Sequence, residues 1–326
     1  MSPPNFEEIV SLENLFHAWR EFVKGKKHKK DVMEFSVRLS ENIFNLHLEL
    51  VDKLYIHGGY EFFKILDPKP RDIHKAFVCD RLLHHAIYRI LYPYFDNKFI
   101  FDSYSCRNGK GTHRAISRLN FFARKVSKNN TKQCWVLKCD IRKFFASVDQ
   151  TILMEILDRQ IIDKNILWLL KKVVQSFHNA EVGNGLPLGN LTSQLLVNIY
   201  MNEFDQFVKH NLKTKYYIRY ADDFVFLSQD KPELENLLPK IKEFLENNLK
   251  LSLHPDKVFI QTFSSGVDFL GWVNFSNHRT LRTVTKRRML KNLRNNPKPE
   301  TVQSYLGLLS HGNTWKLRNE IKVVLK

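Results

Sequence analysis

Apolar positions recur at helical spacing near the start of the chain. This pattern predicts helices over residues 12–23 and 37–54, and we expect the first ~70 residues to be helical. The basic run 24–30 between them predicts a solvated loop, with a phosphate contact as the alternative. The same spacing over residues 77–95 predicts a further helix. We expect it to end at Tyr92-Pro93, because proline disfavours helical backbone in the residue before it.

The middle of the chain mixes strand and helix patterns. Residues 135–140 read as a short buried strand that ends in Asp140, and helical spacing follows from 150 to 177. Two apolar runs, 216–220 and 224–227, flank Ala221-Asp222-Asp223 and predict a hairpin with carboxylates at its tip. The remaining elements are a glycine-bearing loop at 105–112, helices over 113–126, 192–212 and 232–247, a turn-rich connector at 183–189, and strands over 258–262 and 267–273. The alternation predicts an α+β fold.

The charge points to a partner that carries phosphates. The chain has 326 residues, 43% of them hydrophobic, and a formal net charge of +17. Lys and Arg that neutralise phosphates gain affinity by releasing counterions, so nucleic acid is the first expectation. No apolar run approaches the ~20 residues that span a bilayer, and we expect no membrane association. The acidic start, MSPPNFEEIV, does not resemble a secretory signal and predicts a protein that stays inside the cell.

Cysteine usage and the basic C-terminal region complete the composition. The four cysteines show no C-x-x-C spacing, which favours reduced packing residues over a zinc site. Beyond Asn274 the chain is strongly basic and predicts a small helical domain on a nucleic-acid backbone, with a solvated helix as the alternative. The basic residues of its first part are Arg279, Arg282, Lys286, Arg287, Arg288, Lys291, Arg294 and Lys298.

Three carboxylates on two strand segments suit phosphoryl transfer with two divalent ions. Mg²⁺ prefers oxygen ligands and neutralises charge on the attacking and leaving oxygens. Adjacent strand residues point to opposite faces, so we expect Asp140 and Asp222 to bridge both ions and Asp223 to be the weaker ligand. The alternative for an isolated Asp-Asp is an Asx-rich turn.

The order of the motifs resembles the reverse transcriptases. Tyr220-Ala-Asp-Asp223 resembles their Tyr-x-Asp-Asp box, and Lys138-Cys-Asp-Ile-Arg-Lys-Phe-Phe145 resembles their first catalytic box. Further matching segments are 68–71 with 80–86, 103–113, 185–194, 254–257 and 269–272, in the order of the family and covering roughly residues 65 to 275.

The resemblance implies a right-hand polymerase fold and an RNA-directed DNA polymerase. We expect fingers with an N-terminal helical extension over 1–135, an antiparallel palm with helices over 136–275, to whose nucleotide site 186–191 contribute, and a small basic helical thumb over 276–326. It also implies two Mg²⁺ ions, with Mn²⁺ as a substitute, and Asp140, Asp222 and Asp223 as the catalytic and metal-binding residues. The substrates and partners would be dNTPs, template RNA and the primer or cDNA.

Residue roles are carried over from the resemblance position by position. Lys69 and Arg71 would hold the triphosphate, unless they lie in a solvated turn. Phe145 matches the steric gate against a ribose 2′-hydroxyl, with core packing and an exchange with Phe144 as the alternative. Lys257 would stabilise or protonate the leaving pyrophosphate, or is a surface lysine. The implied template or primer contacts are Arg107, Phe269, Leu270, Gly271, Trp272, Arg287 and Arg288.

The segment 185–194 indicates the subfamily. Many reverse transcriptases have Gln where this chain has Leu188, and its Thr192-Ser-Gln194 ending resembles the enzymes of diversity-generating retroelements. We expect Leu188 and Gln194 to contact the nucleotide. An aliphatic residue at 188 is associated in that family with errors at template adenines, since it offers no polar check; simple packing of Leu188 is the alternative.

The subfamily implies further partners. They are a structured retroelement template RNA and a small basic accessory protein oligomer, in a cytoplasmic setting of bacterial, archaeal or phage origin. The alternatives are a group II intron, retron or defence-associated reverse transcriptase and, in another class, a catalytically inactive RNA-binding scaffold.

Overall fold

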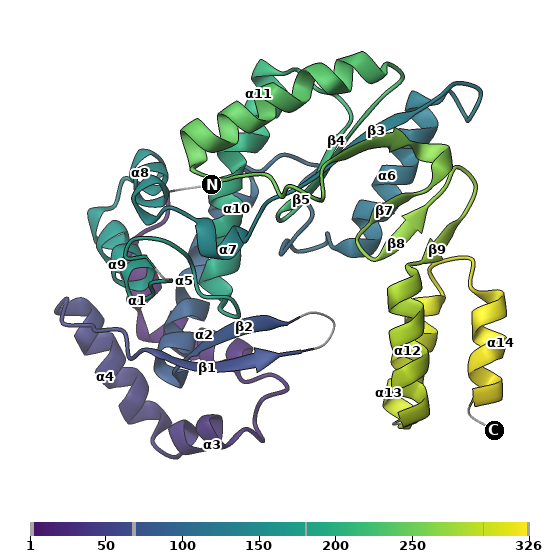
Figure 1. Ribbon diagram of the computed structural model, residues 1–326. Coiled ribbons are helices and arrows are strands. Elements are labelled where there is room, and N and C mark those ends of the chain that lie inside the picture. The colour runs from purple at the N-terminus through teal and green to yellow at the C-terminus, as the bar shows by residue number, and fades with distance from the viewer. Residues whose placement is uncertain (1–2, 67–69, 180, 296, 325–326) are drawn as a thin grey trace. The chain divides into compact units, whose positions relative to one another are not determined.

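The computed structural model describes residues 3–66, 70–179, 181–295 and 297–324 (Figure 1). The chain forms two compact units and passes between them several times. The first unit comprises residues 1–101, 142–207 and 244–252, and the second comprises 102–141, 208–243 and 253–326. The bounds of fingers, palm and thumb given above stay a prediction.

The first unit is mainly helical. Its core lies along α5 (Val78–Asp96), against which α1 (Phe6–Val10), α2 (Leu12–Phe22) and α10 (Leu191–Gln206) pack. The helices α3 (Lys30–Val37), α4 (Leu39–Val51), α7 (Phe144–Ser147), α8 (Gln150–Gln160) and α9 (Lys164–Gln175) complete it. The predicted helix at 150–177 is two helices, because Asp163 caps the second by accepting from the backbone N–H of Asn165 at 2.8 Å.

Two expectations for the first unit were wrong, whereas the helix expected at 37–54 is present as α4. Arg38, with a φ of −118° and a ψ of 42°, separates α4 from α3. The helix α5 continues through Pro93 to Asp96, because buried Tyr92 and Phe95 keep its apolar face packed and offset the lost backbone hydrogen bond. The first 70 residues also contain strand β1 (Tyr60–Ile65), which pairs with β2 (Arg71–Ala76) as an antiparallel hairpin.

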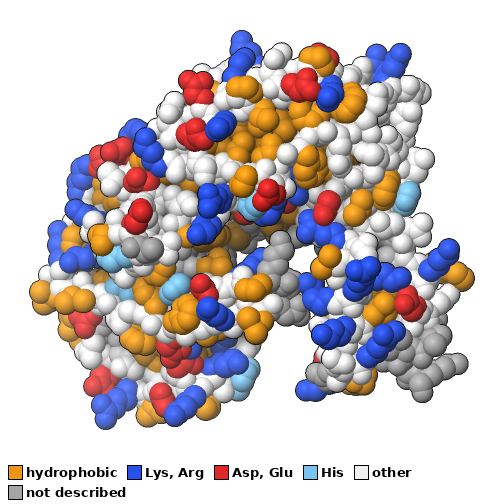
Figure 2. All heavy atoms as spheres, in the orientation of Figure 1, with side chains coloured by type: hydrophobic (Ala, Val, Ile, Leu, Met, Phe, Trp, Pro, Cys, Tyr) orange, Lys and Arg blue, Asp and Glu red, His pale blue; other side chains and the backbone are white. Residues whose placement is uncertain are grey.

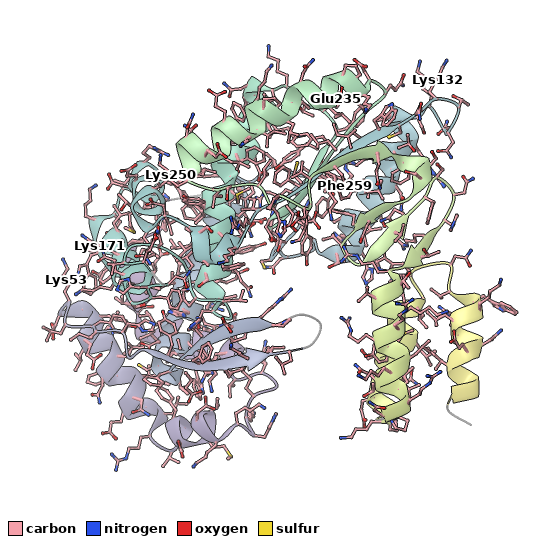
Figure 3. The ribbon with its side chains drawn as sticks, in the orientation of Figure 1. Lys53, Lys132, Lys171, Glu235, Lys250 and Phe259 are labelled. Atoms are coloured by element: carbon pink, nitrogen blue, oxygen red, sulfur yellow. The ribbon has the colours of Figure 1, made fainter. Side chains whose placement is uncertain are left out.

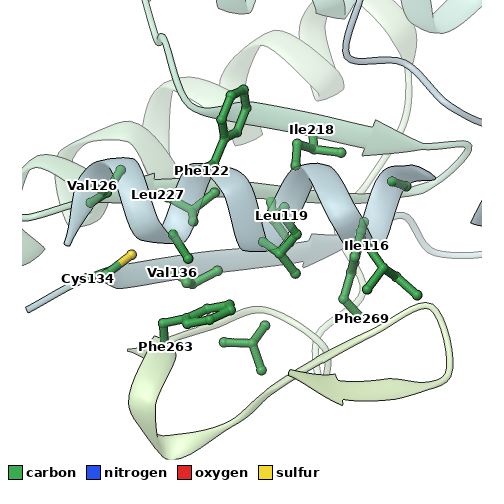
Figure 4. Packing of buried hydrophobic residues seen from close by; sticks show 14 of the residues in the cluster. Ile116, Leu119, Phe122, Val126, Cys134, Val136, Ile218, Leu227, Phe263 and Phe269 are labelled. Carbon is green, nitrogen blue, oxygen red and sulfur yellow. The ribbon is translucent and has the colours of Figure 1, made fainter. Parts of the chain in front are cut away.

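The second unit is built on a four-stranded antiparallel sheet in the order β4 (Tyr217–Tyr220), β5 (Asp223–Ser228), β3 (Trp135–Asp140) and β6 (Phe259–Thr262). The helix α6 (Thr112–Val126) packs on this sheet, and Figure 4 shows Ile116, Leu119 and Phe122 of α6 close to Ile218 and Leu227 of the strands. This buried layer fixes the strands whose ends carry the acidic residues. The helix α11 (Lys231–Leu249) follows β5.

A smaller three-stranded sheet and three helices end the second unit. The sheet has the order β7 (Val267–Phe269), β8 (Trp272–Asn274) and β9 (Arg279–Leu281). The single strand expected at 267–273 is therefore a hairpin. Its two-residue turn, Leu270-Gly271, has φ of 53° and 89°, the geometry that such tight hairpins need. The helices α12 (Thr283–Asn295), α13 (Pro299–Leu309) and α14 (Trp315–Val324) confirm a helical C-terminal region.

Membrane-spanning helices were not expected. Within the described ranges, no helix is both long and apolar enough to cross a bilayer.

Candidate active site

The acidic residues meet where β3 ends and β5 begins. Asp140 is the last residue of β3, and it lies directly opposite Asp223, the first residue of β5. Directly opposed residues of an antiparallel pair project from the same face of a sheet. Asp222 lies in the turn between β4 and β5, where its carbonyl accepts from the Ile141 backbone N–H at 3.2 Å.

This register corrects the expected orientation of Asp223, while its expected rank as the weaker metal ligand stays a prediction. We expected Asp223 to face away from Asp140 by strand alternation, but the turn resets the alternation and makes Asp223 the cross-strand partner of Asp140. The turn begins at Ala221, whose φ of 55° lies in the left-handed region that non-glycine residues seldom adopt. The strained backbone at this point sets the register that places Asp223 opposite Asp140, directly after Asp222 in the turn.

A buried arginine supports the turn. The side chain of Arg219 is fully buried, and its guanidinium donates to the Ala221 carbonyl at 3.2 Å and to Ser103 Oγ at 3.1 Å. These two hydrogen bonds stabilise the strained backbone at Ala221. Arg219 was assigned no role from the sequence, and a charged residue inside an otherwise apolar strand is the signal that could have revealed one.

Asp223 is a buried carboxylate with other charged side chains nearby. Burial raises the pKa of Asp223 to about 7, Lys138 opposes this rise, and the nearby charges of Asp222 and Asp140 reinforce it. Lys138 Nζ lies 3.4 Å from Asp223 Oδ2 and 5.9 Å from the ring centre of Phe259 on β6, which Figure 3 labels. Asp223 Oδ1 is buried and has no hydrogen-bond partner among the described residues. An unsatisfied carboxylate oxygen of this kind is costly unless a cation or donor reaches it.

Two lysines therefore serve the acidic pair. Lys138 is two residues before Asp140 on the same strand and so shares its face, a signal that sequence reasoning missed. Lys257 Nζ lies 2.8 Å from Asp140 Oδ1, and the backbone N–H of His254 donates to the Asp140 carbonyl at 2.7 Å. The segment 254–257 thus brings its lysine to the end of β3, next to the first carboxylate.

The carboxylate oxygens at this site fit an Mg²⁺ ion that is also bound by the phosphates of a substrate. No group of three or more His, Cys, Asp or Glu side chains in the described part of the chain is placed to enclose a metal ion. Mg²⁺ is commonly bound by one or two carboxylates with water and phosphate oxygens rather than by a protein cage. Asp140 with Asp223, whose Oδ1 is unsatisfied, offers such an open set of oxygens.

The first unit contains a cavity of about 500 Å³ that is lined by two of the expected nucleotide-site residues. Phe145 and Leu188 both line it, together with His74 of β2 and Lys143. Phe144 is instead packed in the core, only 3% exposed. Of the two adjacent rings, Phe145 is therefore the one that reaches the cavity.

Backbone hydrogen bonds fix the loop that carries Leu188. The Leu188 carbonyl accepts from the His74 N–H at 3.1 Å, and the Leu186 N–H donates to the Phe145 carbonyl at 2.8 Å. Buried Asn190 donates from Nδ2 to the His74 carbonyl at 2.8 Å, a bridge that sequence reasoning missed. The loop is thus joined to both β2 and α7, which makes the shape of the cavity a fixed feature of this unit.

Three further residues, Arg71, Lys69 and Gln194, were expected to contact the nucleotide. Arg71 is exposed at the start of β2, and Lys69 lies outside the described residues. Gln194 is half-buried on α10, where its carbonyl accepts from Asn198 Nδ2 at 3.2 Å, and it is not among the described residues that line the cavity. The roles of these residues stay predictions.

The residues expected to contact template and primer differ in how exposed they are. Phe269 and Trp272 are buried in the core beneath α6, so the turn residues Leu270 and Gly271 are the more accessible part of that segment. Arg107 is half-buried and donates to the Ser103 carbonyl at 3.0 Å. On α12, Arg287 is exposed and Arg288 is half-buried.

The cysteines are unpaired thiols in this structure. Cys134 and Cys139 are buried, Cys79 is intermediate and Cys106 is exposed. Burial raises the pKa of the Cys134 thiol to about 12, as expected for a packing residue.

Comparison with known families decides the identity of the fold. A family model described as reverse transcriptase (RNA-dependent DNA polymerase) matches residues 68–273. This chain belongs to the reverse transcriptase family. The matched range agrees with the ordered motifs, which identifies Asp140 and Tyr220-Ala-Asp-Asp223 as parts of a reverse transcriptase domain.

Relatives of this reverse transcriptase include intron-encoded proteins. Protein YkfC of Escherichia coli (strain K12) is 27% identical over 284 residues, covering 76% of this chain and 72% of YkfC. Group II intron-encoded protein LtrA of Lactococcus lactis subsp. cremoris is 22% identical over 260 residues, covering 59% of this chain and 42% of LtrA. A putative COX1/OXI3 intron 2 protein of Saccharomyces cerevisiae is 22% identical and is covered over 30% of its length. The chain therefore spans less than half of these two intron-encoded proteins.

Solved structures similar to this reverse transcriptase show its fold. Apo telomerase from Candida tropicalis, truncated from the C-terminal domain, matches with a TM-score of 0.51 and 13% identity over 68% of this chain and 55% of that chain. Telomerase from Candida albicans, in complex with a fragment of telomeric RNA, also matches at 0.51, with 11% identity over 74% of this chain and 50% of that one. The expected right-hand polymerase fold is confirmed.

Proposed function

We propose that this reverse transcriptase is an active RNA-directed DNA polymerase. The observation that carries the proposal is the cross-strand pair Asp140 and Asp223, with Asp222 in the adjoining turn and Lys257 at 2.8 Å from Asp140. When bound, two Mg²⁺ ions would neutralise charge on the attacking and leaving oxygens, and Asp140, Asp222 and Asp223 would hold them. Mn²⁺ would substitute, because it also accepts carboxylate ligands.

The chain's own residues would then bind, orient and select the substrates. Lys257, a cation held beside Asp140, would stabilise charge on the leaving pyrophosphate. The ring of Phe145 would exclude a ribose 2′-hydroxyl and so favour dNTPs. Lys69 and Arg71 would hold the triphosphate oxygens as cations. Exposed Arg287 and the half-buried positions Arg107, Leu270 and Gly271 would contact template or primer.

Primer extension on an RNA template with Mg²⁺ and dNTPs tests this proposal. We expect extension by the wild type and none by Asp222→Asn. An inactive wild-type protein, or an Asp222→Asn variant that is as active as the wild type, would instead favour an RNA-binding scaffold.

We further propose that the enzyme belongs to a diversity-generating retroelement and makes errors at template adenines. The support is Leu188, an aliphatic side chain that lines the cavity and offers no hydrogen bond to a nucleotide there. The similarity to YkfC and LtrA supports the second candidate, a reverse transcriptase of the group II intron type. Sequencing of cDNA made by wild type and Leu188→Gln separates the two. Errors concentrated at template adenines only in the wild type support the first, and a uniformly accurate wild type refutes it.

An accessory protein is the proposed partner besides template RNA. Large apolar side chains are exposed along α3 and α4, and Phe44, Leu48 and Val51 form a stripe at i, i+4 and i+7. Residues 30–53 contain five acids and three Lys or Arg, a net charge of −2 in a strongly basic chain. An apolar surface with acidic neighbours suits a small basic protein better than nucleic acid.

Co-expression with a small basic protein encoded beside the gene tests this partner. We expect copurification with the wild type and with Ile162→Glu, which changes an exposed apolar residue in the loop between α8 and α9. Leu48→Glu should abolish it. Copurification that is unchanged by Leu48→Glu would contradict the proposed surface.

A further inference from the structure

A second cavity, of about 420 Å³, lies among the C-terminal elements of the second unit. It is lined by the turn before β9 and β9 itself, the first turn of α12 and the loop that leads into α14. Its walls carry an aromatic ring, Trp315, two cations, Lys286 and Lys316, and the polar groups of His278, Thr280 and Asn313. None of these residues belongs to the acidic centre described above.

Trp315 is exposed although its helix is well anchored. Its side chain is 71% exposed, an unusual state for a residue type that is mostly buried on average. Two and six positions further along α14, Leu317 and Ile321 are buried in a cluster with Met289 and Leu293 of α12. The exposure of the ring is therefore a property of its position at the start of α14 and not of a loosely packed helix.

The loop before Trp315 is held firmly in place. The Asn313 N–H donates to the Arg279 carbonyl at 2.9 Å, and Thr314 Oγ1 donates to the Leu309 carbonyl at 2.6 Å. A Cβ at Gly312 would lie 2.1 Å from Trp272 Cζ3, so only glycine allows the loop to approach this buried ring. These contacts preform the wall of the cavity, which lowers the ordering cost of binding a ligand.

The charge around the cavity is strongly positive. Residues 276–326 contain twelve Lys or Arg and two Glu, a net +10 of the chain's +17. Lys and Arg side chains gather over α12 and α13 in the view of Figure 2. Lys286 is paired with Glu320 at 3.1 Å, but both side chains are 40% or more exposed, and a surface pair of this kind is weak enough to be exchanged for a phosphate.

We infer that this cavity binds a single unpaired nucleotide, with the base stacked on Trp315 and the phosphate contacted by Lys286 and Lys316. Aromatic rings beside cations bind unpaired bases because every base has a face that can stack, whereas paired bases are not free to do so. Asn313 and Thr280 supply polar groups for the base edge or ribose. The site requires neither bound metal nor polymerase activity. Its ligand is either a free nucleotide or a nucleotide within a single-stranded RNA.

Binding of fluorescein-labelled RNA, measured by anisotropy without Mg²⁺ or dNTPs, tests the inference. We compare an unstructured octamer with a blunt-ended duplex of the same sequence. Trp315→Ala should weaken binding of the single strand by about tenfold or more, the scale of one lost base stack, and leave the duplex within about twofold. Trp315→Tyr should retain most of the affinity, because it keeps a ring on which a base can stack.

Two controls make the result specific. Phe121→Ala removes an exposed ring that also lies beside cations, Arg118 and Lys125, on α6, and it should leave the binding of the octamer unchanged. Glu320→Gln releases Lys286 from its partner and should tighten single-strand binding, whereas Lys286→Gln should weaken it. Equal losses for single strand and duplex in Trp315→Ala, or no loss at all, would overturn the inference.

Competition by adenosine monophosphate separates the two sources of the ligand. Displacement of the octamer from the wild type, together with Trp315-dependent binding of the monophosphate, identifies a free nucleotide as a sufficient ligand. Retention of the octamer with the Trp315 effect intact identifies the RNA strand. Because no nucleotide is incorporated in these measurements, a failure of the proposed polymerase activity would leave their outcome unaffected.

Discussion

Asp140 at the end of β3 lies directly opposite Asp223 at the start of β5. The pairing brings two carboxylates to one face of the sheet, and burial with the nearby negative charges raises the pKa of Asp223 to about 7. Burial is the main reason that the charged form of Asp223 is disfavoured, and the neighbouring carboxylates add to it although Lys138 opposes the shift. A cation that bound both carboxylates would favour their charged forms.

Lys257 should act on the chemical step. Its Nζ is 2.8 Å from Asp140 Oδ1, and in the proposed reaction it would supply positive charge where charge develops on the leaving group. We expect Lys257→Met to lower the rate of single-nucleotide incorporation by about 10²-fold with a small change in the apparent Kd of the dNTP. Rapid-quench kinetics measure both quantities. The control is Lys240→Met, an exposed lysine on α11, and equal losses in the two variants would argue against a role for Lys257.

Phe145 and Phe144 should respond differently to truncation. Phe145 lines the cavity, so Phe145→Ala should reduce the preference for dNTPs over rNTPs by about tenfold or more and leave the fold intact. Phe144 is 3% exposed, so Phe144→Ala should instead destabilise the protein by about 3–5 kcal/mol. It should not increase the incorporation of rNTPs relative to dNTPs. Incorporation assays with each nucleotide and urea unfolding measure the two effects. An increase in rNTP incorporation by Phe144→Ala but not by Phe145→Ala would instead assign the steric gate to Phe144.

His84 should make the protein sensitive to acid. Its ring is buried on α5 and neither nitrogen has a hydrogen-bond partner among the described residues. Burial lowers the pKa of His84 to about 3, and His57, His85 and Arg81 contribute in the same direction. The folded chain therefore keeps His84 neutral, while the unfolded chain takes up a proton below about pH 6.5, so stability is lost as pH falls through that value.

The size of this effect can be measured by substitution. Between pH 7.5 and pH 5, His84 alone should cost the wild type about 2 kcal/mol of unfolding free energy. His84→Leu should remove that part of the loss, whereas His28→Leu, at an exposed histidine, should leave it unchanged. Urea unfolding at the two pH values provides the measurement. A His84→Leu variant with the same pH dependence as the wild type would contradict the assignment.

Local pattern predicted most elements where one face of a segment is apolar and the other polar. The strand 135–140 and the hairpin around Asp222 are found where they were expected, because alternation and turn residues are local properties. The continuation of α5 through Pro93 and the hairpin at Leu270-Gly271 depend instead on packing and on strained backbone, which a periodicity does not encode.

The candidate site shows the same division. The acidic residues could be named from their motif, but the pairing of Asp223 with Asp140 depends on how the Ala221 turn resets the strand alternation. Arg219 and Lys138 stand out in the sequence as charged residues inside apolar strands, but their partners, the Ala221 carbonyl and Asp223, are known only from the folded chain. The Phe144 and Phe145 alternatives could be separated only by burial.

The most direct test of the central claim is the rate of single-nucleotide addition to a primed RNA template, with saturating Mg²⁺ and dNTP. We predict that Asp140→Asn and Asp223→Asn each lower this rate by at least about 10³-fold, the equivalent of several kcal/mol of lost charge stabilisation. Asp230→Asn, at an exposed aspartate just after β5, should stay within about twofold of the wild type. Wild-type protein that adds no nucleotide, or an Asp223→Asn variant that retains the wild-type rate, would contradict the account.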